Sequence, residues 1–222
     1  MDWQAFGLSL RLALATTLVL LVLGLPLGYW LANTRCRFKF LIETFVSLPM
    51  VLPPTVLGFY LLLFLGGQSP VGRFYEKLTG GQLPFSFGGL LVGSVFYSLP
   101  FAVQPFISGF LTVDKKFVEA SWCLGVSKMG TFFRLILPLA LPSILTGIIL
   151  CFAHTLGEFG VVLMIGGNIP GVTRTISISI YDEVQAMNYS DAMKTSGILV
   201  AVSFSVLILT SLIRRKGLRL WN

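Results

Sequence analysis

The chain has 222 residues, of which 55% are hydrophobic and only 11% charged, and its mean hydropathy is +0.86. An ordinary soluble domain carries about 25% charged residues, so this composition excludes disordered, fibrous and disulfide-scaffold classes and argues against a soluble enzyme. The formal net charge of +7 fits membrane orientation and contact with anionic lipids better than nucleic acid. We therefore expect an all-α integral membrane protein with lipid, and no nucleic acid, among its partners.

Stretches without charged residues, trimmed at their Gly- and Pro-rich ends, leave room for five membrane spans of about 20 apolar residues each. The spans are expected near residues 9–32, 41–65, 88–111, 138–160 and 194–213. The apolar run over residues 135–167 is too long for one straight helix, and Gly157-Glu158-Phe159-Gly160 is its expected break. Residues 161–167 either extend that helix outward or dip back, so a sixth element stays open.

Basic residues set the expected orientation, because cytoplasmic loops carry an excess of Lys and Arg. With the N-terminus outside, eleven of the sixteen basic residues fall in inside segments and five in outside segments. The eleven are Arg35, Arg37, Lys39, Lys115, Lys116, Lys128, Arg134, Arg214, Arg215, Lys216 and Arg219. We therefore predict a multi-pass protein of the cytoplasmic (inner) membrane, with its N-terminus outside and its C-terminus in the cytoplasm.

Eight of the eleven prolines fall inside the predicted spans, where each removes a backbone donor and bends its helix. Five short, kinked helices can hardly enclose an aqueous path alone, so the pattern favours an oligomer with a path at the subunit interface. Its first candidates are Pro49, Pro53, Pro54 and the following Thr55. The alternative is that proline is simply commoner in membrane helices than in soluble ones.

Small residues predict close helix contacts at two further places. Gly24-x-x-x-Gly28 and Gly89-x-x-x-Gly93 both match the small-xxx-small contact pattern of membrane helices. Because the chain has 23 glycines, such matches also arise without a contact, and both interpretations stay open.

Residues 112–138, TVDKKFVEASWCLGVSKMGTFFRLILP, form the longest segment expected on the inside. Asp114 can cap a short helix that runs to about Leu124, where Gly125 offers a stop. Four apolar residues then recur at i, i+3, i+4 and i+7, which predicts a second helix in the membrane interface, capped by Ser127. The four are Met129, Phe132, Phe133 and Ile136. Together the two helices would form a rigid elbow.

This segment resembles the EAA loop of permease subunits from bacterial ABC importers. That pattern is Glu-Ala-Ala, three residues, Gly, nine residues and Ile-x-Leu-Pro, and it is matched here by Glu119, Ala120, Ser121, Gly125, Leu135, Leu137 and Pro138. Only Ser121 and Leu135 depart from it. The resemblance implies that residues 114–125 form a coupling helix that docks in a groove of an ATP-binding subunit. An ordinary amphipathic connector is the alternative.

A narrower resemblance extends from about residue 8 to residue 213. LPMVLPPTVLGFYLL (48–62), FAHTLGEFGVV (152–162) and NIPGVTRT (168–175) look like the molybdate branch of these permeases, close to the tungstate and sulfate branches. The resemblance implies a type I ABC importer permease, with residues 1–222 as one transmembrane domain. Its expected partners are a second copy of itself, two ATP-binding cassette subunits and an external oxyanion-binding protein docking on residues 66–87 and 167–193. Sulfate and tungstate stay open beside molybdate, since one path passes any tetrahedral anion.

His154 and Glu158 are four residues apart on one expected helix face, and ionisable residues in a span face protein or a cavity. Either they satisfy each other or nearby backbone at the helix break, or they line or brace the path. A negative Glu158 would repel an anion, which favours bracing or gating over ligand contact. Hydroxyl groups could serve the path as donors or bond their own helix backbone. These are Thr55, Ser98, Ser143, Thr146 and Thr155.

Motifs for other chemistries are absent from the sequence. No Gly-x-x-x-x-Gly-Lys-Ser/Thr phosphate loop occurs, so ATP hydrolysis is expected on the partner subunit. One His and three scattered Cys suggest no metal site, cofactor or catalytic residue. A stand-alone secondary transporter is an alternative, although the echo of residues 48–54 in residues 137–143 shows no inverted repeat. An intramembrane enzyme around His154 is a third alternative, without a nucleophile motif.

Overall fold

The computed structural model describes residues 2–219, and every regular element in that range is helical. The helices before the elbow are α1 (Trp3–Asn33), α2 (Lys39–Ser47), the 3-10 turn η1 (Leu48–Met50), α3 (Pro54–Leu65), α4 (Pro70–Thr79) and α5 (Phe87–Leu111). Those that follow are α6 (Lys115–Cys123), α7 (Lys128–Thr131), the π turn η2 (Phe132–Ile136), α8 (Leu137–Leu156), α9 (Gly160–Gly166), α10 (Ile176–Gln185) and α11 (Tyr189–Arg219). The all-α prediction is confirmed for this range.

Within residues 2–219, four helical segments are long and apolar enough to cross a membrane, and a bent pair raises the number to five. The four are Trp3–Asn33, Phe87–Leu111, Lys128–Leu156 and Tyr189–Leu209. The bent pair is Lys39–Met50 with Pro54–Leu65. These five segments coincide with the five predicted spans.

The predicted span near residues 41–65 is right in position, and its expected proline bend is a complete break between two helices. Its two halves meet at 113° across a short break. Pro53 is extended at φ −55° and ψ 136°, as expected for a residue that precedes a proline, and Pro54 then opens α3. The Pro-Pro pair thus breaks the span, which is either a broken crossing or a re-entrant segment.

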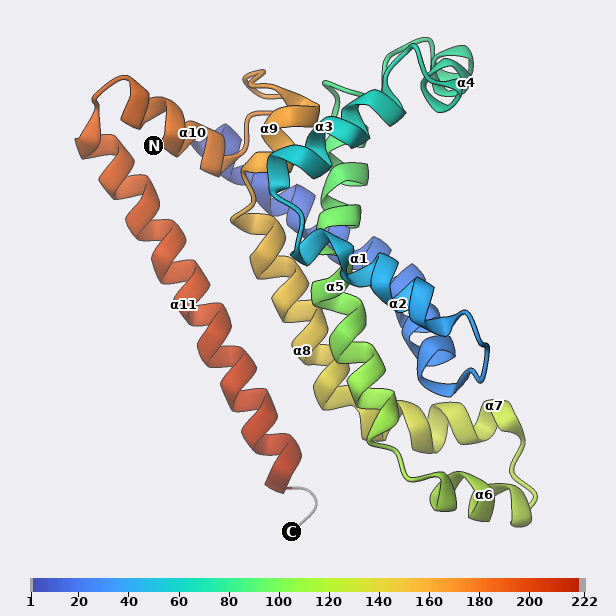
Figure 1. The fold of residues 1–222 in the computed structure, drawn as a ribbon. Coiled ribbons are helices and arrows are strands. Elements are labelled where there is room, and N and C mark those ends of the chain that lie inside the picture. The colour runs from blue at the N-terminus through green and yellow to red at the C-terminus, as the bar shows by residue number, and fades with distance from the viewer. Residues whose placement is uncertain (1, 220–222) are drawn as a thin grey trace.

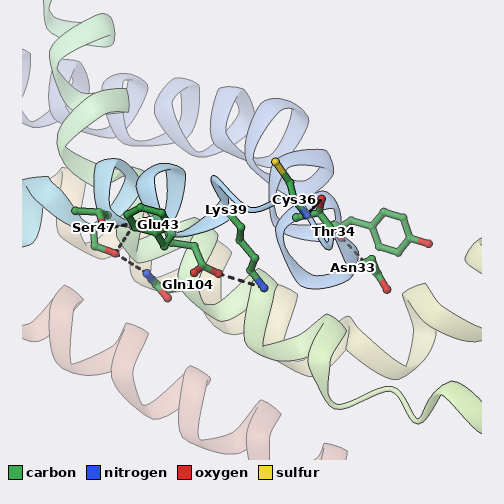
Figure 2. A network of polar contacts seen from close by, with 10 residues as sticks. Asn33, Thr34, Cys36, Lys39, Glu43, Ser47 and Gln104 are labelled. Carbon is green, nitrogen blue, oxygen red and sulfur yellow. Dashed lines mark hydrogen bonds and ion pairs between the residues drawn. The ribbon is translucent and has the colours of Figure 1, made fainter.

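Hydrogen bonds outside the break hold the first half of this span on the bundle (Figure 2). Gln104 of α5 donates to the Ser47 hydroxyl at 2.7 Å, and that hydroxyl donates to the Glu43 carbonyl oxygen at 2.8 Å. Lys39 and Glu43 form an ion pair one turn earlier, at 3.5 Å. The end of α2 is therefore tied to α5 immediately before the chain turns.

The centre of the molecule is made by α1, α5 and α8, which pack around one aromatic side chain. Phe106 of α5 is fully buried. A Cβ on Gly28 of α1 would lie 2.9 Å from the Phe106 Cβ, and one on Gly147 of α8 would lie 2.8 Å from its ring. A Cβ on Gly24 of α1 would lie 3.5 Å from the Cε2 of the same ring. The contact predicted for Gly24 and Gly28 is confirmed, because glycines on both sides let three helices approach this ring.

The second small-residue pair makes one helix contact instead of two. A Cβ on Gly93 of α5 would lie 2.5 Å from the Ile165 Cδ1 of α9. Gly89 lies one turn earlier, where the backbone of Leu83 in the preceding turn closes over it. Gly89 therefore allows the chain to enter α5, and only Gly93 serves helix packing.

The predicted break at residues 157–160 is confirmed. α8 ends at Leu156, and α9 begins at Gly160 after a short irregular stretch. Residues 161–166 belong to this separate short helix, which packs against α3 and α5. The sixth element left open by the sequence is thus present, although it is too short to cross a membrane.

The predicted elbow is formed by α6 followed by α7 and η2, which run transverse to α8 in Figure 1. Hydrogen bonding continues through the π turn into α8, directly before Pro138, whose ring lacks an N–H for the carbonyl of Arg134. Phe132 packs on Tyr29 at 5.0 Å between ring centroids and Ile136 is buried, whereas Met129 and Phe133 are exposed. The predicted face thus packs on the bundle through two of its four residues, and its contact with the membrane interface stays a prediction.

The described ends of the chain lie at opposite ends of the bundle in Figure 1. The start of α1 shares one end with α4, α9 and α10, whereas the elbow, the α1–α2 turn and the end of α11 share the other. Helix α11 stands apart and packs on α8 and α10. Five crossings would place the two ends of the chain on opposite sides of a membrane, and this separation agrees with that number.

Candidate functional site

The two irregular points of the membrane helices meet in space. A Cβ on Gly160, the first residue of α9, would lie only 2.6 Å from the Cβ of Pro54, the first residue of α3. One turn further, a Cβ on Gly58 would lie 2.7 Å from the Met164 Cβ. We call this contact of α3 with α9, together with residues 157–159, the break junction. It joins the predicted proline cluster to the predicted helix break.

The four predicted path residues of this segment lie in different environments. Pro49 is buried and Pro54 half-buried, whereas Pro53 and Thr55 are exposed in the single chain. Apolar residues beneath them close the junction into a cluster with α9. They are Leu57, Leu61, Val161 and Ile165. Of the four predicted path residues, only Pro53 and Thr55 are therefore exposed enough to contact a path outside the single chain.

His154 is held by α5. Its Nδ1 lies 3.0 Å from the Ser98 hydroxyl oxygen, and its ring stacks on Phe101 at 3.8 Å between centroids and 22° between planes. Ser98 also shares a hydrogen bond of 2.8 Å with the Thr155 hydroxyl. The imidazole is therefore oriented on two sides by one neighbouring helix.

Glu158 lies beyond the end of α8, so the expected shared helix face with His154 is wrong. The helix stops at Leu156 because Gly157 ends it, and Glu158 turns into the protein interior, where it is 5% exposed. Neither carboxylate oxygen completes a hydrogen bond of good geometry with any described residue. The Ser94 hydroxyl and the Val162 backbone N–H face it as weaker partners.

Ser94 is a site residue that sequence reasoning missed. It is fully buried on α5, one turn before Ser98, and its hydroxyl likewise completes no hydrogen bond within the described residues. One strip of α5 thus presents Ser94 to Glu158 and Ser98 to His154. The spacing Ser94-x-x-x-Ser98 could have indicated such a strip beside the predicted pair.

The other candidate hydroxyls are expected either to serve the path as donors or to bond their own helix backbone. Thr146 donates to the Pro142 carbonyl oxygen of its own helix at 2.9 Å, and Thr155 donates to the Cys151 carbonyl oxygen at 2.9 Å. Both therefore satisfy their own helix backbone. Thr155 also bonds Ser98, so these two hydroxyls of the set join α8 to α5.

The elbow carries the second group of predicted site residues. Asp114 caps α6 by accepting a hydrogen bond from the Lys116 N–H at 2.9 Å, and Gly125 ends it at φ +79°, where a side chain would be strained. Both predictions are confirmed. None of the nine described residues of α6 is buried, and Glu119 and Ala120 are both exposed. The helix is therefore capped locally, and its half-buried Val118 packs against the central cluster of the bundle.

Ser121 links α6 to α7. Its hydroxyl shares a hydrogen bond of 2.8 Å with that of Thr131, a buried residue of α7. Ser127 caps α7 through the Gly130 N–H at 3.1 Å, as predicted. The departure of Ser121 from the EAA pattern thus makes a contact that alanine could not make.

The opposite end of the bundle is tied by Arg174. Its Nε donates to the Asn168 Oδ1 at 2.7 Å, and its guanidinium forms ion pairs with Asp182 at 3.6 Å and Asp2 at 3.9 Å. Asn168 in turn donates to Asp182 at 2.7 Å. Arg174 therefore holds the loop after α9 to α10 and to the start of α1.

Comparison with known proteins agrees with this architecture. A family model described as "Binding-protein-dependent transport system inner membrane component" matches residues 24–216. The molybdenum transport system permease protein ModB of Azotobacter vinelandii is 52% identical over 93% of this chain and 91% of its own length. The probable sulfate transport system permease protein cysT of Prototheca wickerhamii is 32% identical over 92% of this chain and 80% of its own.

Solved structures share the fold at low sequence identity. The inward-facing MetNI methionine ABC transporter superimposes with a TM-score of 0.77 at 16% identity, covering 98% of this chain and 96% of that one. A bacterial alginate ABC transporter superimposes with a TM-score of 0.73 at 15% identity, covering 96% of this chain and 78% of that one. With its long family match and its close relatives, the chain belongs to the inner-membrane components of binding-protein-dependent transport systems and has the fold of a type I ABC importer permease.

Proposed function

We propose that the chain is the permease subunit of an ATP-driven importer that takes molybdate from an external binding protein. The observation that carries the coupling is α6, a capped helix without a buried residue among those described, which lies at one end of the bundle with most of its surface exposed. The assignment of molybdate as the substrate is supported by the relative named a molybdenum transport permease, which is 52% identical along almost its whole length. Sulfate is the second candidate, supported by the 32% identity to a probable sulfate permease.

The proposed mechanism begins at the surface of α6. Asp114 starts the helix, and Glu119, Ala120 and Gly125 form the side that docks on an ATP-binding cassette subunit. Motion of that subunit reaches α7 through the hydrogen bond of Ser121 to Thr131. It then follows the continuous helical segment Lys128–Leu156 up to the break junction. ATP favours one state through its differential contacts on the partner, where its hydrolysis is expected.

The proposed gate is the break junction. Pro53 and Thr55 are exposed beside it, which supports a place on the path between two copies of the chain. His154 is already bonded to Ser98, and Glu158 is buried, so both are proposed as braces of the gate rather than as ligands of the anion. A homodimer with two ATP-binding subunits completes the proposed assembly, and residues 66–87 and 167–193 are its proposed docking face for the binding protein.

The proposed orientation places the elbow in the cytoplasm. Basic residues of the α1–α2 turn, α6 and α7 gather at the end where α11 finishes, opposite the described start of α1. A tag on the N-terminus is expected to be accessible outside, and one on the C-terminus inside. Both tags on one side of the membrane would overturn this topology.

The deciding experiment is purification of the tagged chain from native membranes, with mass spectrometry of the proteins that accompany it. We expect a subunit with a phosphate-binding loop in equal stoichiometry. The ATPase activity of the reconstituted complex should then rise with molybdate-loaded binding protein and less with the sulfate-loaded form. A chain that purifies alone and carries anions into liposomes without ATP would instead support a secondary transporter.

A further inference from the structure

A cavity of about 380 Å³ lies between the elbow and the ends of α1 and α5, and we call it the elbow pocket. Its apolar wall includes Ala32, Phe110, Val118 and Ile136. Three cations from three separate segments line it as well: Arg35 after α1, Lys115 at the start of α6 and Lys128 at the start of α7. Segments far apart in the sequence thus bring three positive charges to one cavity.

The charges of the elbow pocket are not balanced from within. Glu119 is the one acid among its described lining residues. Among the side chains that the structure describes, which do not include those of residues 1, 210 and 213–222, no ion pair involves Arg35, Lys115, Lys128 or Glu119. Like charges around one cavity repel, and an anion between them removes that repulsion. Tyr29 and Trp122 also line the pocket and add neutral hydrogen-bond donors.

We propose that the elbow pocket binds a phosphate group, either that of an anionic phospholipid headgroup or free phosphate. Lys and Arg side chains are the usual protein partners of phosphate, through charge-assisted hydrogen bonds. Basic pockets between membrane helices on the cytoplasmic side accept acidic lipid headgroups, and the apolar wall suits the start of an acyl chain. The volume falls in the range of small-ligand sites. The cytoplasmic side is the part of this argument that rests on the proposed function.

A bound phosphate would brace the elbow. α6 packs on α7 and carries no buried residue among those described, so few contacts hold it against the membrane helices. A phosphate between Arg35 on the bundle side and Lys115 and Lys128 on the elbow side joins the two parts. Occupancy is therefore expected to stiffen the helix proposed to couple to ATP.

The test measures lipid binding to the purified full-length chain, with any subunit that accompanies it, by native mass spectrometry. The probe is phosphatidylglycerol, with phosphatidylcholine as the neutral lipid. The pocket variant combines Arg35→Gln, Lys115→Gln and Lys128→Gln. Its matched control combines the neighbouring exposed cations outside the pocket, in Arg37→Gln, Lys116→Gln and Arg134→Gln. We expect the pocket variant to lose about tenfold or more in phosphatidylglycerol affinity, and the control to stay within about twofold.

A variant that is expected to raise the lipid affinity distinguishes loss of the site from misfolding. Glu119→Gln removes the acid from the pocket and should tighten phosphatidylglycerol binding, which a damaged fold would not do. Competition by millimolar inorganic phosphate would identify free phosphate as the occupant, and its failure would identify the lipid. Equal losses in the pocket and control variants, or a loss in neither, would overturn the site. Lipid binding is measured without ATP or transport. A negative result would therefore not contradict the proposed importer function, and the lipid-binding result can be interpreted even if that function is refuted.

Discussion

The break junction and the elbow are both irregular parts of this helical chain, but they are held together in opposite ways. At the junction, backbones touch so closely that Gly160 and Gly58 have no room for a Cβ beside Pro54 and Met164. At the elbow, α6 has caps at both ends and no buried side chain among its described residues. The first depends on distant packing and the second on local hydrogen bonds.

This difference suits the two regions to the different tasks proposed for them. A helix that forms locally and has most of its surface exposed can be bound by a partner without disturbing the bundle. A junction without spare volume transmits a displacement, because close-packed interiors deform little. Substitutions should therefore affect docking at the elbow and stability at the junction, and the following changes test that division.

The largest effect is expected for Glu119→Lys at the elbow. Reversing this exposed charge should weaken binding of the ATP-binding subunit by about a hundredfold, as for charges in a docked interface. The thermal unfolding midpoint of the chain should stay unchanged, because α6 contributes no buried residue within the described range. Pull-down titration and thermal unfolding measure the two quantities, and Glu76→Lys on the distant α4 is the matched control. Intact docking would refute the role of Glu119.

Gly160→Ala should act on stability instead. The new Cβ would lie 2.6 Å from that of Pro54, and overpacking of this kind costs about 1–3 kcal/mol. The control is Gly197→Ala in α11, where no described atom lies within 4 Å of the new Cβ and the helix gains from alanine. Thermal unfolding in detergent should show a lower midpoint for the first variant only. Equal midpoints would mean that the junction yields more easily than its geometry implies.

Glu158→Gln separates stability from transport within the junction itself. The buried carboxylate completes no good hydrogen bond with the described residues, so the amide should leave the unfolding midpoint equal or higher. If Glu158 braces the gate, anion uptake should fall by about tenfold, the usual size of a lost coupling contact. Uptake into proteoliposomes containing the complex is the measurement. Normal uptake would leave Glu158 without a functional role.

The smallest effect is expected for Asp114→Ala. Loss of the cap costs about 1 kcal/mol and should remain within α6, because the Asp114 carboxylate bonds only its own first turn in the described structure. Amide hydrogen exchange should rise by about fivefold in residues 115–124 and stay constant in α8. Asp114→Asn, which keeps a capping oxygen, should restore the protection. Faster exchange along α8 would show that the elbow is less independent than proposed.

Sequence reasoning succeeded where the signal was local. The Asp114 and Ser127 caps, the stop at Gly125 and the break before Gly160 each depend on residues within one turn, and each lies where it was predicted. The five span positions follow equally from local hydropathy. The EAA resemblance likewise rests on a short segment.

Reasoning from spacing failed where it assumed that a helix continues unchanged. Glu158 leaves the helix that carries His154, because that helix ends at Leu156. The π turn over Phe132–Ile136 also departs from regular α-helical geometry, and within it Phe133 is exposed in the single chain whereas Ile136 is buried. Helical periodicity predicts a common face only where 3.6 residues per turn persist, and proline, glycine and the π turn each interrupt that geometry.

Local patterns in the sequence suffice for the membrane class, the positions of the spans and the capped helix α6, because hydropathy and capping act between near neighbours. The contact of Pro54 with Gly160, the approach of Ser94 to Glu158 and the gathering of three cations at the elbow pocket appear only in the folded chain. Those contacts join elements separated by tens of residues. Their partners depend on how whole helices pack, which no local pattern encodes.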